Sequence, residues 1–551
     1  MPSRVPPASR AATPGDLSWT SLVGAGLSLR VARRRRVVAD RARWQRGTAR
    51  IQADTLRALL TKAQRTAFGR EHGFGRLASI AGDADLERAY REAVPLRDWL
   101  GFQDHIARMR EAGEPDVLWP GLVKRFAQTS GTTAGDKFIP VSDEMMRSNY
   151  RASLDIFCAL IARGVSIPRM MGGRCLFLGG SSDLRAGEHG IVTADLSGLV
   201  TPLIRWPLST IYSPGPEIAL LSDWPEKLEA MAELSMRQDI RFISGMPSWA
   251  GVLMQRVLEK TAEPTIRDVW PNLSVFVHGG VKYDPFRARV AELYSGDAHE
   301  DIPVRHELYP ASEAFVAMQD TPGDPGMRLL ADIGVHYEFV PFEQIDSDAP
   351  EAFTAGEVER GQKYVVVLSS CAGLWRYVLG DLVEFDDVPD GLEGRPGTGP
   401  ARLRIVGRHR HFINAFGENL IGEHIEAGVA RAARETGLSH GEFTAAPVYP
   451  GEGRRAGLEL VIEIDPGAGP DALAAFVRTF DAGVKAENVD YTTKRADDVG
   501  MAPPTLTPVP PGTFHAWMAS RGKLGGQHKC PRCANHREIV DSVRLAAPAQ
   551  P

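Results

Sequence analysis

Cysteine is scarce in this sequence, which has five among 551 residues: Cys158, Cys175, Cys371, Cys530 and Cys533. A secreted disulfide framework uses more cysteines, in even number, so we predict a chain from a reducing compartment. Cys530 and Cys533 form a lone CxxC pair, whereas a structural zinc site needs four ligands. His528 and His536 flank the pair and keep zinc as an alternative, but two thiols in a loop are the favoured interpretation.

Long hydrophobic runs are also missing. No apolar stretch reaches the roughly 18 residues that a membrane-spanning helix needs. The mildly apolar stretch from Leu17 to Ala32 is followed by the arginines 33–36, whereas a signal peptide has its basic residues first. We therefore expect a cytoplasmic protein with no membrane partner. The arginine cluster could contact an anionic surface, but a solvated tail is the favoured interpretation.

An excess of positive charge is missing as well. The chain has 64 Lys and Arg against 69 Asp and Glu, which gives a formal net charge of −5. Dedicated nucleic-acid binders carry a basic face, so we expect no nucleic-acid partner. The hydrophobic content of 43% is ordinary for a globular protein, and the length favours two or more domains.

Short apolar runs that end in glycine recur along the first part of the chain. They lie at residues 174–178, 240–244 and 275–277, and each is followed by a helical pattern. Strands that alternate with amphipathic helices predict an α/β fold with a mainly parallel sheet. Before them, the apolar spacing within residues 47–64 predicts a helix. Residues 1–45, rich in Pro, Ala, Ser and Arg, are expected to form a partly disordered extension.

The pattern starts again after the Gly- and Pro-rich stretch 389–400, which itself follows a β-branched strand at residues 364–370. Strands are predicted at 403–406 and 458–464, and helices at 423–435 and 472–484. We therefore predict a large domain over residues 46–407 and a smaller α/β domain over residues 408–551.

The segment Thr129–Lys137 (TSGTTAGDK) is the most informative motif. Its glycines let a backbone approach a phosphate closely, and its hydroxyl and N–H groups can donate hydrogen bonds to phosphate oxygens. Lys137 adds a compact positive charge. The Walker A pattern is absent, so the segment predicts a phosphate-binding loop of another kind.

This segment resembles the phosphate loop of the adenylate-forming (ANL) superfamily and, in its TSGTTxGxK form, that of the GH3 family of acyl-acid amido synthetases. Six further segments resemble GH3 motifs in the same order along the chain: Ser244–Trp249, Trp270–Val281, Tyr309–Glu313, Gly373–Asp381, Gly407–Glu418 and Gly522–Arg532. The chain departs from the superfamily at Asn414, where a lysine is common, so no role for that lysine is transferred.

The resemblance implies a large adenylate-forming domain and a smaller, mobile C-terminal domain. It also implies an enzyme that uses ATP and Mg²⁺ to adenylate a small carboxylic acid and then transfers the acyl group to an amino acid. The implied catalytic residues are Lys137, Glu313, which would also bind the metal, and one of the competing lysines Lys523 and Lys529. The implied ATP contacts are Thr129, Ser130, Gly131, Thr132, Thr133, Gly279, Gly280, Tyr309, Ser312, Asp381 and Arg408.

Residues for the acyl substrate are less clearly marked. Arg147, on an expected helix over residues 143–157, could pair with a carboxylate, although a solvent-facing arginine is the alternative. Trp249 could form a wall of the acyl pocket or belong to the core. The sequence does not identify the acid or the amino acid.

Three other functions were weighed. An α/β-hydrolase needs a Gly-x-Ser-x-Gly elbow, which does not occur in the chain. An acyl-CoA synthetase would share the adenylation step and differ in the nucleophile. A non-catalytic nucleotide-binding protein would lack chemistry at Lys137, Glu313 or Asp381, whereas all three are present.

Overall fold

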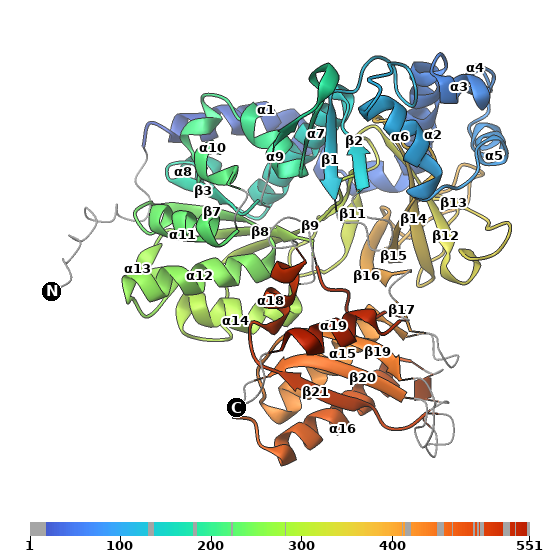
Figure 1. Cartoon of the computed structure of the whole chain (residues 1–551). Helices are drawn as coiled ribbons and strands as arrows, with labels where there is room; N and C mark the ends of the chain where they lie inside the picture. The colour runs from blue at the N-terminus through green and yellow to red at the C-terminus, as the bar shows by residue number, and fades with distance from the viewer. Residues whose placement is uncertain are drawn as a thin grey trace.

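The computed structural model describes most of the chain (Figure 1). The described residues are 18–129, 137–179, 184–221, 224–280, 283–409, 412–413, 420–448, 457–464, 467–488, 491–492, 495, 501–521, 529–534 and 536–547. Within them, a 12-stranded sheet dominates the large domain, and a 3-stranded sheet forms the C-terminal part. None of the helices that the structure describes is long and apolar enough to cross a lipid bilayer.

The large sheet is mixed rather than mainly parallel, so that part of the fold prediction is wrong. In spatial order its strands are β13 (Phe353–Thr354), β12 (Val335–Pro341), β14 (Lys363–Ser370), β15 (Tyr377–Asp387), β16 (Arg402–Arg408), β11 (Met327–Leu329), β10 (Phe315–Gln319), β9 (Val304–Pro310), β8 (Val275–Gly279), β7 (Ile240–Gly245), β3 (Arg174–Phe177) and β6 (Tyr212–Ser213).

The change of direction in this sheet occurs at β9. Strands β9, β8, β7, β3 and β6 pair in parallel, as the strand and helix alternation predicts. From β9 through β10 to β13 every pair is antiparallel. Helix-length connections are needed only between parallel neighbours, and residues 311–401 contain no described α-helix, so their strands pair in antiparallel fashion.

Helices cover the parallel half of the sheet on both faces. On one face lie α11 (Trp224–Ser235), α12 (Pro247–Thr261), α13 (Ile266–Val269) and α14 (Asp284–Ser295). The other face lies under α7 (Asp143–Ala162), α8 (Ile167–Met170) and α9 (Leu196–Val200). The short helix α10 (Pro216–Ala219) packs its Ile218 against the cluster formed by α11 to α14. A separate 4-stranded sheet has the order β2 (Lys137–Pro140), β1 (Arg125–Thr129), β5 (Val192–Ala194) and β4 (Arg185–Ala186).

The N-terminal helices pack on the antiparallel half. They are α2 (Arg41–Ala63), α3 (Ala67–Glu71), α4 (Phe74–Ala78), α5 (Asp83–Ala93) and α6 (Gln103–Arg110). The apolar stripe of α2, which includes Leu56, Leu59 and Leu60, is buried in the main core, because these residues recur on one face at helical spacing. This confirms the helix predicted within residues 47–64.

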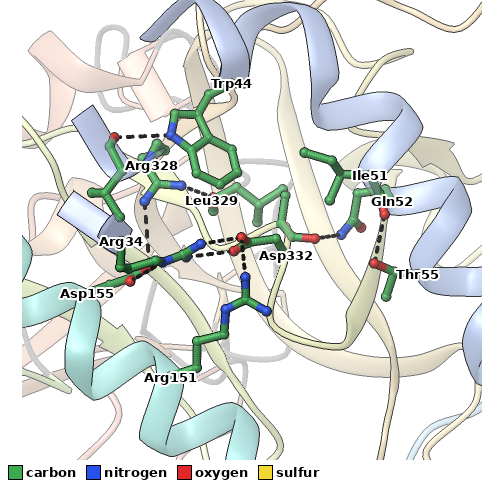
Figure 2. A network of polar contacts seen from close by, with 12 residues as sticks. Arg34, Trp44, Ile51, Gln52, Thr55, Arg151, Asp155, Arg328, Leu329 and Asp332 are labelled. Carbon is green, nitrogen blue, oxygen red and sulfur yellow. Dashed lines mark hydrogen bonds and ion pairs between the residues drawn. The ribbon is translucent and has the colours of Figure 1, made fainter. Parts of the chain in front are cut away.

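The extension expected before residue 46 contains a further helix, α1 (Ser21–Ala39), which packs on α7 and α8. Arg34 holds it in place, since its guanidinium donates to both carboxylate oxygens of Asp155 at 2.6 Å. The same guanidinium contacts Asp332 at 2.5 and 2.9 Å, and Arg151 of α7 contacts Asp332 at 2.9 Å (Figure 2). Residues 21–39 therefore form a packed helix and not a solvated tail.

The C-terminal part is a sheet between two helical layers. Its strands are β19 (His440–Val448), β20 (Gly457–Ile464) and β21 (Thr505–Val509), after the short pair β17 (Phe412–Ile413) and β18 (Leu420–Ile421). Its helices are α15 (Gly422–Thr436), α16 (Pro470–Glu487), α18 (Thr513–Ser520) and α19 (Glu538–Ala546). Leu460 and Ile462 face the α15 and α16 side, whereas Val461 faces α18 and α19.

Candidate active site

The two ends of the TSGTTAGDK segment lie on neighbouring strands. Strands β1 and β2 are antiparallel, and Thr129 pairs directly with Lys137 at the end of the ladder. Ser130, Gly131, Thr132 and Thr133 lie outside the described residues, as does the side chain of Thr129. Lys137 is half-buried at the start of β2, and β2 leads into α7 through its N-cap Ser142. The hairpin thus holds both ends of the predicted phosphate loop next to each other.

Three of the motifs meet at one edge of the large sheet. The parallel strands β7, β8 and β9 end together, because Gly245 is in register with His278 and Gly279 with Leu308. Ligands in α/β sheets bind beyond the carboxyl ends of parallel strands. The segments 244–249, 278–280 and 309–313 therefore border one site.

Glycine is required at two places on this edge. A Cβ on Gly279 would lie 2.6 Å from the carbonyl oxygen of Leu308, which is too close for any side chain. Gly280 has φ +85°, a backbone conformation that other residues rarely adopt. A Cβ there would lie 3.4 Å from the side chain of Met246. The turn after β8 is therefore bare backbone, which a flat ligand can approach closely.

A hydrogen bond between Tyr309 and Asp381 joins the parallel edge to the antiparallel half of the sheet. The Tyr309 hydroxyl donates to Oδ2 of Asp381 at 2.7 Å, and both side chains are buried. These residues come from β9 and β15, which are not neighbours in the sheet. The contact brings two motifs that are 72 residues apart in the sequence to one place.

The strand that leads toward the C-terminal part also reaches this point. Arg408 of β16 is in register with Asp381, although its side chain lies outside the described residues. The next residue, His409, is buried, and its backbone N–H donates to the carbonyl oxygen of Gly380 at 3.0 Å. The chain therefore leaves the large sheet directly beside the buried carboxylate of Asp381.

Ser312 and Glu313 lie in the tight turn between β9 and β10, where Ala311 N–H donates to the Ala314 carbonyl at 2.9 Å. Both side chains are buried. In the part of the chain that the structure describes, no cluster of three or more His, Cys, Asp and Glu side chains could hold a metal ion. A single carboxylate fits Mg²⁺ when nucleotide phosphates and water supply the other ligands, which is how Mg²⁺ is commonly bound.

The C-terminal part contributes Lys529. A Cβ on Gly280 would lie 3.3 Å from the Lys529 Nζ, so this ammonium group reaches the turn after β8. Lys523, its competitor in the sequence analysis, lies outside the described residues. Lys529 therefore lies at the edge of the large sheet where β7, β8 and β9 end.

The segment that carries Lys529 is fixed to β19. Ala445 N–H donates to the Arg532 carbonyl at 2.9 Å, and Ala534 N–H donates to the Ala445 carbonyl at 3.0 Å. The Thr444 hydroxyl donates to the Pro531 carbonyl at 2.7 Å. The Arg532 side chain forms ion pairs with Glu442 and Glu426. The Pro and Arg of this motif thus anchor the lysine rather than contact the site.

Cys530 and Cys533 of the same segment are both buried. Burial raises the pKa of the Cys530 thiol to about 12, so it is protonated at neutral pH. His528 lies outside the described residues. The described part of the segment matches the interpretation as two thiols, each packed in a different hydrophobic cluster of the C-terminal part.

Two arginines, Arg147 and Arg376, form ion pairs with carboxylates of the protein itself. Arg147 is exposed on α7 and forms a surface ion pair with Glu144 at 3.1 Å. Arg376, in the GH3-like segment Gly373–Asp381, is buried and donates to Glu338 at 2.9 Å and to the carbonyl oxygen of Val94 at 2.7 Å. Its role in this structure is to hold the N-terminal helices on the sheet.

Trp249 follows β7 at the start of α12, close to the strand edge in sequence. Its side chain is half-buried and packs against the hydrophobic cluster formed by α11 to α14. This packing matches the core alternative weighed for it.

His278 is a site-adjacent residue whose part the sequence did not indicate. Its ring stacks on Tyr283 at 4.6 Å between centroids, just before and after the Gly279–Gly280 turn. Burial lowers the pKa of His278 to about 3, so the ring is neutral at physiological pH. The stack supports the glycine turn from the side of α14. The sequence signal was the triplet His278-Gly279-Gly280, which lies in the GH3-like segment Trp270–Val281, but no role was predicted there for His278.

Family models match most of the chain. The GH3 family N-terminal domain matches residues 43–200 and 186–299, the GH3 family central domain residues 328–391, and the GH3 family C-terminal domain residues 423–538. Among curated relatives, an indole-3-acetic acid-amido synthetase GH3.8 of Oryza sativa subsp. indica is 26% identical over 374 residues, which cover 64% of this chain and 53% of the rice protein. The chain thus aligns with about half of that relative's length.

A second relative, the jasmonoyl–L-amino acid synthetase JAR4 of Nicotiana attenuata, is 21% identical over 62% of this chain and 67% of its own length. Among solved structures, the GH3.15 acyl acid amido synthetase has a TM-score of 0.71 at 16% identity and covers 92% of this chain and 95% of its own. A 2-hydroxyisobutyryl-CoA ligase in the postadenylation state has a TM-score of 0.56 at 14% identity, with 90% of each chain covered. The chain therefore belongs to the GH3 family of acyl-acid amido synthetases, whose fold is related to that of the adenylate-forming enzymes.

Proposed function

We propose that the protein is an ATP-dependent acyl-acid amido synthetase. It activates a small carboxylic acid as an acyl-adenylate, with release of pyrophosphate, and transfers the acyl group to the amine of an amino acid, with release of AMP. The observation that carries this proposal is the contact of Tyr309 with Asp381 at the edge where β7, β8 and β9 end. This contact joins the motif that contains Asp381 to the three motifs that end at this edge.

ATP binding is assigned to groups around this edge. The hairpin loop from Thr129 to Thr133 donates to phosphate oxygens, while the turn at Gly279 and Gly280 accommodates the flat base. Asp381 accepts hydrogen bonds from the ribose hydroxyls, as an acidic residue does in dinucleotide sites. Tyr309 orients that carboxylate through its hydroxyl. Ser312 and Arg408 complete the proposed set.

Charge accumulates on phosphorus oxygens when the carboxylate attacks the α-phosphate. Lys137 on β2 and Lys529 beside Gly280 bring positive charge toward the site from two different parts of the chain. Preorganised charges of this kind stabilise a transition state strongly. Glu313 is the residue that would hold Mg²⁺. When bound, this ion would neutralise phosphate charge and orient the triphosphate.

The second step needs access for the amine. We propose that the domain over residues 408–551 turns relative to the domain over residues 46–407 between the two steps, about the backbone at Gly407 and Arg408. Hinges absorb such changes at the ends of elements, and β16 ends at Arg408. The turn would move Lys529 away from Gly280 after adenylation, because the lysine is anchored to β19.

The acid is proposed to be a small, mainly apolar carboxylic acid. The names of two relatives contain indole-3-acetic acid and jasmonoyl, which are acids or acyl groups of this kind. Arg147 and Trp249 stay predictions for the acyl pocket. A cytoplasmic location is proposed as well, and the small number of cysteines, five in 551 residues, supports it, since disulfide-stabilised secreted proteins use more of them.

A pyrophosphate-release assay tests the proposal. The purified full chain is incubated with ATP, Mg²⁺ and a panel of aryl, indolyl and aliphatic acids, each with and without an amino-acid mixture and, separately, with coenzyme A. We expect release with at least one acid and an amide product with amino acids. Thioester without amide would instead identify an acyl-CoA synthetase. ATP binding without pyrophosphate release across the panel would favour a non-catalytic nucleotide-binding protein.

A further inference from the structure

Helix α1 presents an unusual side to solvent. Leu22 and Leu29 are 74% and 78% exposed, which places them among the most exposed large apolar side chains that the structure describes. Trp19, in the turn before the helix, is 61% exposed. One and two turns after Leu29, on the same side, come the exposed residues Arg33 and Arg36. At 3.6 residues per turn, positions 22, 29, 33 and 36 form one stripe.

The buried side of α1 explains why this stripe faces outward. Gly24 has no room for a side chain, since a Cβ there would lie 2.6 Å from the Ile167 carbonyl oxygen of α8. Val31 is fully buried, and Arg34 is held between Asp155 and Asp332 (Figure 2). These contacts fix the rotation of the helix about its axis. The leucines and arginines of the stripe are therefore displayed on a rigid support.

The positive charge on this helix is uncompensated. In the described residues, Arg30, Arg33, Arg35 and Arg36 are exposed and none of them forms an ion pair with a carboxylate. Arg30 instead lies over the ring of Tyr150, itself 45% exposed, at 5.5 Å from the ring centroid. The chain as a whole has a net charge of −5, so α1 is a local basic region on an acidic protein.

We propose that α1 docks the protein on the surface of an anionic lipid membrane, with Trp19, Leu22 and Leu29 in the interface and the arginines on lipid phosphates. Peripheral membrane helices bury Trp and Leu in the interface and bind anionic lipids through Lys and Arg. In α1 the exposed apolar residues lie toward the N-terminal end of the stripe and the arginines toward its C-terminal end. Anionic headgroups attract arginines that are held close to the membrane surface. The helix lies on the bilayer and does not span it.

Two other partners fit less well. A nucleic acid would use the arginines but would leave Leu22 and Leu29 in water, so it explains half of the stripe. A second copy of the chain would pair the stripe with itself across a twofold axis and bring arginines of like charge together. The matches to the GH3 family begin at residue 43, so α1 lies outside the part of the chain that defines the family.

The proposed docking surface on α1 is at odds with the sequence prediction of no membrane partner. That expectation was based on the lack of a spanning segment and on residues 1–45 as a solvated extension. The sequence did not indicate that α1 is ordered or that its leucines face outward. The helix has apolar residues on both sides and therefore lacks a clear amphipathic period.

Vesicle co-sedimentation with the full chain tests the proposal. Vesicles of phosphatidylcholine with phosphatidylserine are compared with vesicles of phosphatidylcholine alone. The variant Arg33→Glu/Arg36→Glu should weaken binding to the anionic vesicles on the order of tenfold or more. Leu22→Ser/Leu29→Ser should weaken it by a similar factor, since both apolar insertions are lost. High salt should weaken binding by the wild type.

A matched control carries the same kinds of change elsewhere. Arg88→Glu/Leu545→Ser alters an exposed arginine of α5 and a leucine of α19 that is 87% exposed, and it should bind as the wild type does. Circular dichroism and pyrophosphate release confirm that each variant is folded. Absence of binding to anionic vesicles, or binding unchanged in both α1 variants, would overturn the proposal. The proposal would also be overturned if the α1 variants lost RNA binding or dimerisation and no vesicle binding were seen.

Discussion

The two sides of the candidate site are built differently. Tyr309, Glu313 and Asp381 are buried, between 3% and 8% exposed, and belong to the large sheet or to turns between its strands. Lys529 is exposed and reaches the same place from a segment fixed to β19 of the C-terminal part. One side is held by the core of the large sheet, and the other is brought to it by the C-terminal part of the chain.

This difference indicates a division of labour. Buried groups in a packed sheet keep their geometry through a reaction cycle, because repacking them would disturb the core. A lysine on another domain can take part in one step and leave for the next. We therefore expect changes on the sheet side to affect both half-reactions, because the adenylate stays bound there, whereas changes on the C-terminal side affect adenylation alone.

The largest effect is expected from Lys137→Ala. This lysine stands opposite Thr129 at the end of the hairpin and brings charge to the triphosphate. Its loss should lower the rate of pyrophosphate release by about 100- to 1000-fold, with the melting temperature unchanged. Lys62→Ala, at an exposed lysine that is 3.4 Å from Glu144, is the control and should retain activity. If Lys137→Ala turned over at a near-normal rate, the hairpin would not belong to the active site.

Lys529→Ala separates the two sides most directly. We expect the adenylation rate to fall about 100-fold, because a charge beside Gly280 is lost. Amide formation from a chemically prepared acyl-adenylate should stay close to that of the wild type. Rapid-quench measurements of the two half-reactions give both rates. Lys485→Ala, in α16 of the same domain, serves as the control.

An equal loss of both half-reactions in Lys529→Ala would contradict the comparison. It would mean that Lys529 stays at the site throughout, or that it supports the domain interface in both steps. Normal rates of both half-reactions in Lys529→Ala would indicate that Lys523 is the catalytic lysine of the C-terminal part.

Tyr309→Phe probes the buried side. The variant removes the hydroxyl that donates to Asp381, a hydrogen bond to a charged group worth roughly 1.5–3 kcal/mol. The KM for ATP should rise about tenfold or more, with a smaller change in kcat, since Asp381 loses its orientation toward the ribose. Tyr337→Phe is a matched control: its hydroxyl donates to the Phe315 carbonyl at 2.7 Å in the same core. An ATP KM that rises equally in both variants would indicate a general loss of packing.

The sequence predicts the local elements of this fold well and their pairing less well. The strands near residues 174, 240, 275 and 364, and the helices at 423–435 and 472–484, are all present. Each is specified by its own apolar period and end signals. The antiparallel half was missed because β-branched runs such as Tyr364–Ser370 have the same pattern in either kind of buried sheet.

The same limit applies to the site. The motifs around Lys137, Glu313 and Asp381 identify chemistry through residue types and order, and these can be found from the sequence. The bond between Tyr309 and Asp381 depends on the order of β9, β10, β11, β16 and β15 in space, which no local pattern contains. Which lysine reaches Gly280 depends on how Arg532 and Pro531 attach their segment to β19, again a matter of tertiary structure.

The smallest effect is expected from Thr444→Val, which sharpens the comparison at its anchor. The Thr444 hydroxyl donates to the Pro531 carbonyl at 2.7 Å, two residues from Lys529, and valine has nearly the same shape. A lost hydrogen bond of this kind costs about 1 kcal/mol, so adenylation should fall a few-fold while the KM for ATP stays unchanged. Thr436→Val, which loses a bond to the Ala432 carbonyl at the end of α15, controls for stability of the same domain. If Thr444→Val raised the KM for ATP as Tyr309→Phe does, the anchor and the buried carboxylate would act together, and the site would have one side rather than two.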